Sequence, residues 1–171
     1  MIVLFQWLFF SLLSTPVQEG PAVRFEITNA GITVNGYFKE STFTLAFDPE
    51  NLKSSSLAGK VKVASIQTGI GLRDRHLQGR QYFVADTYPE ISMWSKSISR
   101  EGNNTYLGVF YIRIKDITRE AIVPFRVESE GGKLRFTARF TLNRLDYGIG
   151  ENSLILSNEV TVLLDVSRQH P

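Results

Sequence analysis

The 171-residue chain contains no cysteine and only two histidines, His76 and His170. The absence of cysteine excludes disulfides, thiolate nucleophiles and cysteine-based metal sites together. Two distant histidines without cysteine cannot supply a typical zinc site, and the carboxylates are scattered along the sequence. We therefore expect neither a bound metal nor a cofactor.

The sequence also lacks a run of lysine or arginine, and its formal net charge is only +2. A protein that follows a phosphate backbone carries a basic stripe, so we expect no nucleic-acid partner. Catalytic patterns are missing as well, because no Gly-x-Ser-x-Gly elbow occurs and His76 is the one histidine away from the C-terminus. Asp74 is two residues from His76, and on a helix the two would point to different sides. We expect no enzymatic activity.

Long hydrophobic runs are confined to one segment, the twelve residues from Ile2 to Leu13. This run is short for a membrane-spanning helix, but its length suits the apolar region of a signal peptide. No basic residue precedes it and no clear cleavage site follows, so a buried N-terminal element is the alternative. We predict a signal peptide at residues 1–18 and a periplasmic or secreted protein.

Phenylalanine is abundant, with 12 residues, most of which lie in segments that alternate apolar and polar side chains. Such alternation predicts β-strands with one apolar face. We expect eight to nine strands, starting near residues 23, 32, 43, 61, 91, 106, 121, 134 and 160. Gly102-Asn-Asn104 and Gly131-Gly132 are typical of hairpin turns, and Asn35-Gly36 suggests a bulge or a bend.

Strands of this kind need a cover for their apolar face, which a second sheet or closure into a barrel provides. Succession through short turns favours an all-β, antiparallel up-and-down barrel over a sandwich. A barrel of about eight strands has room inside for side chains or for one slender ligand.

One segment, from Thr68 to Phe83, has helical instead of strand spacing and contains three arginines. Thr68 as N-cap and Gly79 as C-cap predict one short mid-chain helix of about ten residues. In one interpretation this helix plugs the barrel, with Leu72 and Leu77 packed inward and the arginines solvated. In the other, its N–H groups and basic side chains meet a polar group of a ligand at the barrel mouth.

Several blocks of the sequence resemble the YceI-like family, the polyisoprenoid-binding barrels of the bacterial envelope. They are Phe43-Thr-Leu-Ala-Phe-Asp-Pro-Glu-Asn51, Ala64-Ser-Ile-Gln-Thr-Gly69, Leu72-Arg-Asp-Arg-His-Leu77, Tyr88-Pro-Glu-Ile91, Phe140-Thr-Leu-Asn-Arg-Leu-Asp-Tyr-Gly148 and Ser157-Asn-Glu-Val-Thr-Val-Leu-Leu164. The resemblance covers residues 23–167, and we assign residues 21–168 to one such domain.

The resemblance implies a lipocalin-like barrel that holds a long isoprenoid chain, from a quinone or a polyprenyl phosphate, as an envelope carrier or reservoir. It also allows transient membrane contact and a homodimer. The alternative is a structural or stress-response envelope domain whose core is filled by its own side chains, without a ligand.

Alternation and the resemblance together give two candidate sets of binding residues. The predicted apolar lumen consists of Phe25, Phe43, Leu45, Phe47, Val61, Val63, Phe110, Phe125, Phe136, Phe140 and Leu164. The predicted head-group site consists of Arg73, Asp74, Arg75 and His76.

Overall fold

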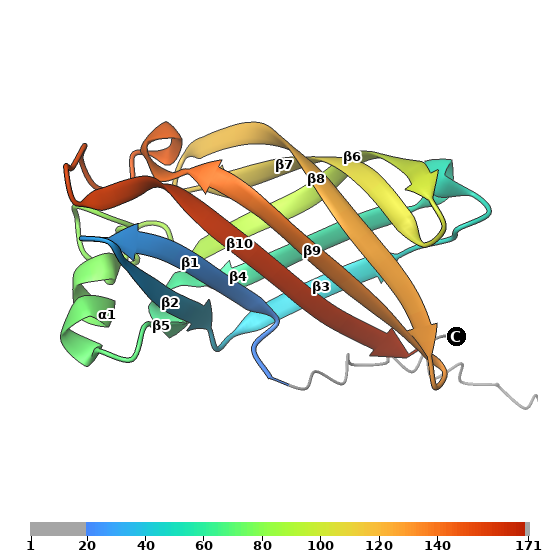
Figure 1. The fold of residues 1–171 in the computed structure, drawn as a ribbon, viewed down its shortest axis with the longest axis horizontal. Helices are drawn as coiled ribbons and strands as arrows, with labels where there is room; N and C mark the ends of the chain where they lie inside the picture. The colour runs from blue at the N-terminus through green and yellow to red at the C-terminus, as the bar shows by residue number, and fades with distance from the viewer. Residues whose placement is uncertain (1–19, 170–171) are drawn as a thin grey trace, which may run out of the picture.

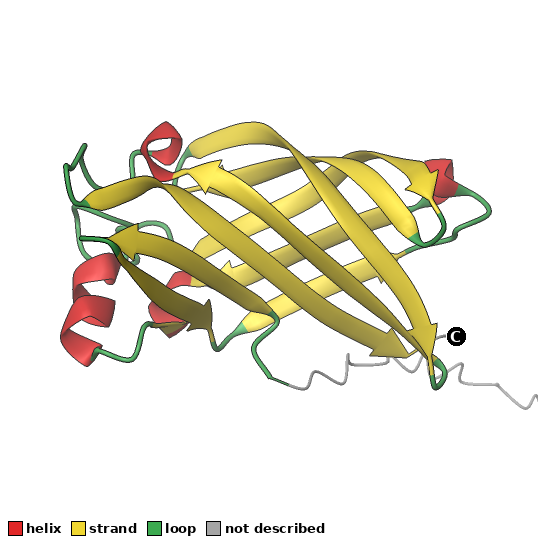
Figure 2. Cartoon of the chain, in the orientation of Figure 1, coloured by secondary structure: helices red, strands yellow, loops and turns green. Residues whose placement is uncertain are grey.

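Ten strands form one antiparallel sheet in the computed structural model, which describes residues 20–169. The sheet curls around an apolar interior, and one α-helix lies at one end of it (Figures 1 and 2). The elements are β1 (Val23–Asn29), β2 (Ile32–Phe38), β3 (Ser41–Ala46), β4 (Ser56–Lys62), β5 (Ile66–Gln67), α1 (Gly71–Gln78), β6 (Glu90–Gly102), β7 (Thr105–Ile114), β8 (Ile117–Glu130), β9 (Lys133–Asn143) and β10 (Leu156–Gln169).

The strand order is β3-β4-β6-β7-β8-β9-β10-β1-β2-β5, so most strands lie beside their neighbours in sequence. The first strand, β1, pairs antiparallel with the last, β10. This arrangement confirms the predicted all-β antiparallel fold with one short helix mid-chain. The structure has ten strands instead of eight to nine because the two-residue β5 adds to the nine predicted segments.

The predicted turns between the long strands are confirmed by their backbone angles. Gly131 and Gly132 have φ of 57° and 75° between β8 and β9, and Asn104 has φ of 58° between β6 and β7. These left-handed conformations are those in which glycine and asparagine are enriched.

The predicted bulge at Asn35-Gly36 is wrong, because β1 and β2 pair without a register shift over their whole length. Gly36 lies directly opposite Phe25, and the Phe25 ring covers it so closely that an added Cβ would be 2.2 Å from Cζ of that ring. The glycine therefore makes room for an aromatic side chain inside the barrel.

The α1 helix is shorter than predicted and begins at Gly71, after Ile70. Thr68 is not its N-cap, because the Thr68 hydroxyl and backbone N–H both donate to Asp74 Oδ1, at 2.5 and 2.8 Å. Gly79 follows the last helical residue, as predicted. Within residues 20–169, α1 and the other helical segments are too short and too polar to cross a bilayer. The predicted signal peptide lies outside the described residues.

Candidate functional site: an apolar cavity in the barrel

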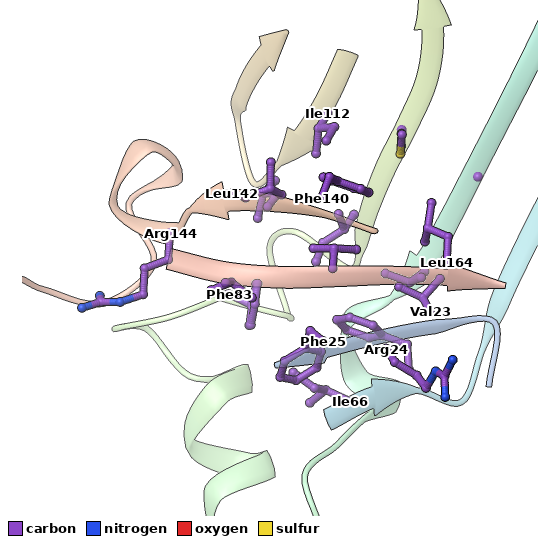
Figure 3. Close-up of a pocket in the computed structure, with 18 of the residues that line it drawn as sticks. Val23, Arg24, Phe25, Ile66, Phe83, Ile112, Phe140, Leu142, Arg144 and Leu164 are labelled. Carbon is purple, nitrogen blue, oxygen red and sulfur yellow. The ribbon is translucent and has the colours of Figure 1, made fainter. Parts of the chain in front are cut away.

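The curled sheet encloses a cavity of about 540 Å³, within the size range of small-molecule binding sites. Its walls are mainly the inward apolar side chains of the strands, and Figure 3 shows several of these, from β1, β7, β9 and β10, directed into the same space. Ile70 and Leu72 belong to the lining although they are 53% and 71% exposed. The cavity therefore opens to solvent beside the start of α1.

An aromatic cluster closes the cavity at its other end. Phe110, Phe125 and Phe136 belong to the lining, and the Phe47 and Tyr106 rings pack behind them. The Phe47 ring meets those of Tyr106 and Phe136 edge to face, with centroids 5.0 and 5.5 Å apart. Edge-to-face contacts of this length are favourable, so we expect this end to be rigid.

Nine of the eleven residues predicted for the lumen line this cavity, and two do not. Phe47 is buried as alternation predicts, but it follows the last residue of β3 and lies in the aromatic cluster behind the cavity. Val63 is 1% exposed but lies in the 3-10 turn Val63–Ser65, directly after the end of β4 at Lys62. The nine that line the cavity are Phe25, Phe43, Leu45, Val61, Phe110, Phe125, Phe136, Phe140 and Leu164.

Polar side chains gather where the cavity meets α1. Thr68, Arg73 and His76 belong to the lining. Arg73 donates from Nε to the Thr68 hydroxyl at 2.7 Å and from Nη2 to the Thr68 carbonyl at 2.6 Å. The guanidinium is thus held by the β5–α1 loop at the edge of the cavity.

The predicted head-group set is only partly brought together. Arg73 and His76 line the cavity, whereas Asp74 and Arg75 do not. Asp74 is buried, and its carboxylate holds the loop at Thr68 instead of facing a ligand. Arg75 is exposed on the outer side of α1. Sequence proximity grouped four residues that the helix separates onto different sides.

Arg144 is a cavity residue that the sequence prediction omits. It is 4% exposed and comes directly after β9, in the 3-10 turn Arg144–Tyr147. Its guanidinium donates to neutral acceptors, which are the carbonyls of Ser157, Ile149 and Leu156 and Asn158 Oδ1. The salt bridges within residues 20–169 do not include Arg144. Figure 3 shows Arg144 directed away from the labelled apolar side chains, at the end of β9.

A signal for Arg144 exists in the sequence. Phe136, Phe140 and Leu142 face the cavity, and Arg144 continues the same two-residue period by one step. Tyr147, in the same turn, is also a lining residue, and burial raises the pKa of its phenol. This end of the cavity therefore combines a buried positive charge with a neutral hydroxyl. The Arg144 guanidinium already donates to protein acceptors, so its role is to hold the turn after β9 against residues 149–158.

No cluster of three or more histidine, aspartate or glutamate side chains that could hold a metal ion occurs within residues 20–169. The predictions of no metal, no cofactor and no enzymatic activity stay predictions.

A comparison with protein families matches residues 17–167 to the YceI-like domain. A UPF0312 protein of Pseudomonas syringae pv. tomato is 27% identical over 149 residues, covering 81% of this chain and 78% of its own. Protein YceI of Salmonella arizonae is 26% identical over 84% of this chain and 78% of its own. The UPF0312 protein plu2095 of Photorhabdus laumondii is 27% identical over 64% of this chain, but the match spans only 57% of that protein.

Solved structures with low sequence identity share the fold. BcnA of Burkholderia cenocepacia superposes with a TM-score of 0.82 at 23% identity, covering 85% of this chain and 94% of its own. A polyisoprenoid binding domain from Saccharophagus degradans superposes with a TM-score of 0.67 at 10% identity, covering 87% and 93%. These likenesses show the same curled antiparallel sheet.

Proposed function

Because the chain belongs to the YceI-like domain family, we propose that it binds a long-chain isoprenoid lipid in its barrel and acts as a carrier or reservoir for that lipid. The observation that carries the proposal is the 540 Å³ apolar cavity, open beside α1 and closed by aromatic rings. The neighbouring Saccharophagus structure is described as a polyisoprenoid binding domain, which supports the same ligand class. A quinone and a polyprenyl phosphate both have the required chain.

Transfer energies support binding from water. Each five-carbon isoprenoid unit releases about 3 to 4 kcal/mol on leaving water, at about 0.8 kcal/mol per carbon. A few units exceed the cost of association, which is about 4 to 15 kcal/mol. A chain in a bilayer is already out of water, however, so the cavity gains little over the membrane. We infer from this balance that the protein carries lipid and does not sequester it.

The alternative, a structural domain with a self-filled core, predicts that inward side chains leave no room for a ligand. The cavity volume favours a ligand over this alternative. We further propose that the protein works in the periplasm or outside the cell, where the predicted signal peptide would deliver it.

The proposal is tested by filling the cavity. Ala138 lines it on β9, so Ala138→Trp places a large side chain in the space that the isoprenoid would occupy. We expect affinity for a short isoprenoid alcohol, measured by fluorescence titration in water, to fall at least about tenfold, or about 1.4 kcal/mol.

The matched control is Thr141→Trp, on the exposed outer face of the same strand. This variant should bind like the unmodified protein, because aromatic side chains are tolerated at exposed strand positions. Equal affinity of both tryptophan variants and the unmodified protein would contradict binding in the cavity.

A further inference from the structure

Exposed large apolar side chains are concentrated at one end of the barrel. The structure has six within residues 20–169, and five of them belong to segments at the α1 end, the left side of Figure 1. These five, here called the apolar rim, are Ile32, Ile70, Leu72, Leu154 and Ile155. Single exposed apolar residues are normal on a soluble protein, whereas a group around one opening marks an interaction surface.

The rim segments are physically connected. Ile32 follows the β1–β2 turn, and the backbone N–H of Ala30 in that turn donates to the Ile155 carbonyl at 2.7 Å. Ile70 and Leu72 line the same cavity as Asn29 and Leu156, which flank the other two segments. The apolar rim therefore lies beside the cavity opening.

Charge near the opening is basic on the helix side. Residues 66–83 contain three arginines against one aspartate, and that aspartate is buried against Thr68. Arg75 and Arg80 are exposed, and the salt bridges of the described residues do not include them. Glu151, beside Leu154 and Ile155, offsets part of this charge. The apolar side chains are therefore the main attraction and anionic head groups a secondary one.

We propose that the apolar rim docks on the surface of a lipid bilayer, with the cavity opening against the membrane. Apolar side chains that enter the head-group region beside basic residues are the usual means by which a protein binds a membrane surface. The inference rests on the proposed function, since an isoprenoid chain that passes from bilayer to cavity through this contact never crosses water. Uptake of the chain then avoids the full cost of exposing each unit to water.

Vesicle binding tests this proposal without any isoprenoid present. The double variant Ile32→Ser, Leu154→Ser changes two rim residues that do not line the cavity. We expect its affinity for vesicles of phosphatidylethanolamine and phosphatidylglycerol to be lower by about tenfold or more, measured by co-sedimentation. Vesicles of phosphatidylcholine alone should bind the unmodified protein more weakly, because they lack the anionic head group.

The control is Ile122→Ser, which removes a side chain about as exposed as Ile32, at 67% against 70% accessible, from β8 on the barrel wall. It should leave vesicle affinity unchanged. Equal loss in both variants, or no binding of the unmodified protein to either vesicle, would overturn the proposal. If the rim variant abolished a dimer in sedimentation while its vesicle binding stayed the same, the apolar rim would be a contact between two copies of this chain, and membrane docking would be overturned.

A second measurement on the same variants distinguishes isoprenoid binding in the cavity from membrane docking by the apolar rim. The rim variant should keep its affinity for a short isoprenoid alcohol in water but take up a long-chain isoprenoid from vesicles more slowly, by about tenfold. Normal uptake from vesicles by this variant would refute docking and leave the proposed cargo intact. Rim-dependent vesicle binding by a protein that takes up no isoprenoid would support docking and refute the cargo.

Discussion

The contact between Gly36 and Phe25 allows a sharp test of how the cavity wall is built. A Cβ at Gly36 would lie 2.2 Å from Phe25 Cζ and 2.7 and 2.8 Å from its two Cε atoms. Gly36 does not have a positive φ, so alanine fits the backbone and the conflict is with the ring alone. In Gly36→Ala the Phe25 ring must therefore move toward the cavity that it lines.

The cost of this movement is estimated from two opposing effects. Overpacking costs about 1 to 3 kcal/mol, and the lower entropy of the unfolded chain returns about 0.4 to 1 kcal/mol. We expect Gly36→Ala to lower the free energy of unfolding by about 1 to 2 kcal/mol. For a domain of this size, the melting temperature would fall by about 2 to 8 °C. Affinity for an isoprenoid should fall too, because the displaced ring takes up cavity space.

Chemical unfolding of a double-mutant cycle with Phe25→Leu measures this effect. The smaller leucine leaves space for the new methyl group, so the penalty of Gly36→Ala should vanish in that background. The cycle should give a coupling free energy of about 1 to 2 kcal/mol. Additive effects of the two substitutions would refute the argument, since they would show that the new methyl group does not meet the ring.

Two further predictions concern charged side chains. Arg144→Met removes the donor to one buried and two partly buried carbonyls and should lower the free energy of unfolding by at least about 2 kcal/mol. Arg139→Met, at an exposed ion pair with Glu26, should change it by less than about 1 kcal/mol in the same urea titrations. The hydrogen bonds from Arg135, at 2.6 and 2.8 Å, lower the pKa of Asp165 in the folded protein. The Asp165 carboxylate therefore stabilises the fold fully at pH values above its unfolded pKa of about 3.9. This stabilisation is lost as the pH falls through the lower pKa of the folded state. Both side chains are partly exposed, so Asp165→Asn should cost only about 0.5 to 1 kcal/mol at pH 7, and urea titration at pH 2 should show a clearly smaller difference between the two proteins.

Strand positions could be predicted from the sequence because alternation records which face of a strand is buried. Phe136, Phe140 and Leu164 follow this period and face the interior as expected. The period does not record where a strand stops or where a cavity ends. Val63 therefore turned out to be in a 3-10 turn, and Phe47 in the aromatic cluster behind the cavity.

The polar end of the cavity was harder to predict because it depends on contacts between distant segments. Asp74 is a helix residue with an unremarkable sequence position, and only the fold shows that its carboxylate holds Thr68. Arg144 follows the inward period of β9, but a charged residue at the end of a strand is equally compatible with a solvated turn. Its burial depends on the carbonyls of a loop that returns to it at residues 149–158.

Mass spectrometry of an organic extract shows whether the protein carries an isoprenoid, using protein purified from its native host without detergent. We expect a long-chain isoprenoid in the extract of the unmodified protein and a strongly reduced amount with Ala138→Trp, while Thr141→Trp retains it. An extract without isoprenoid, from protein that also takes up none when an isoprenoid is supplied, would contradict isoprenoid binding in the cavity.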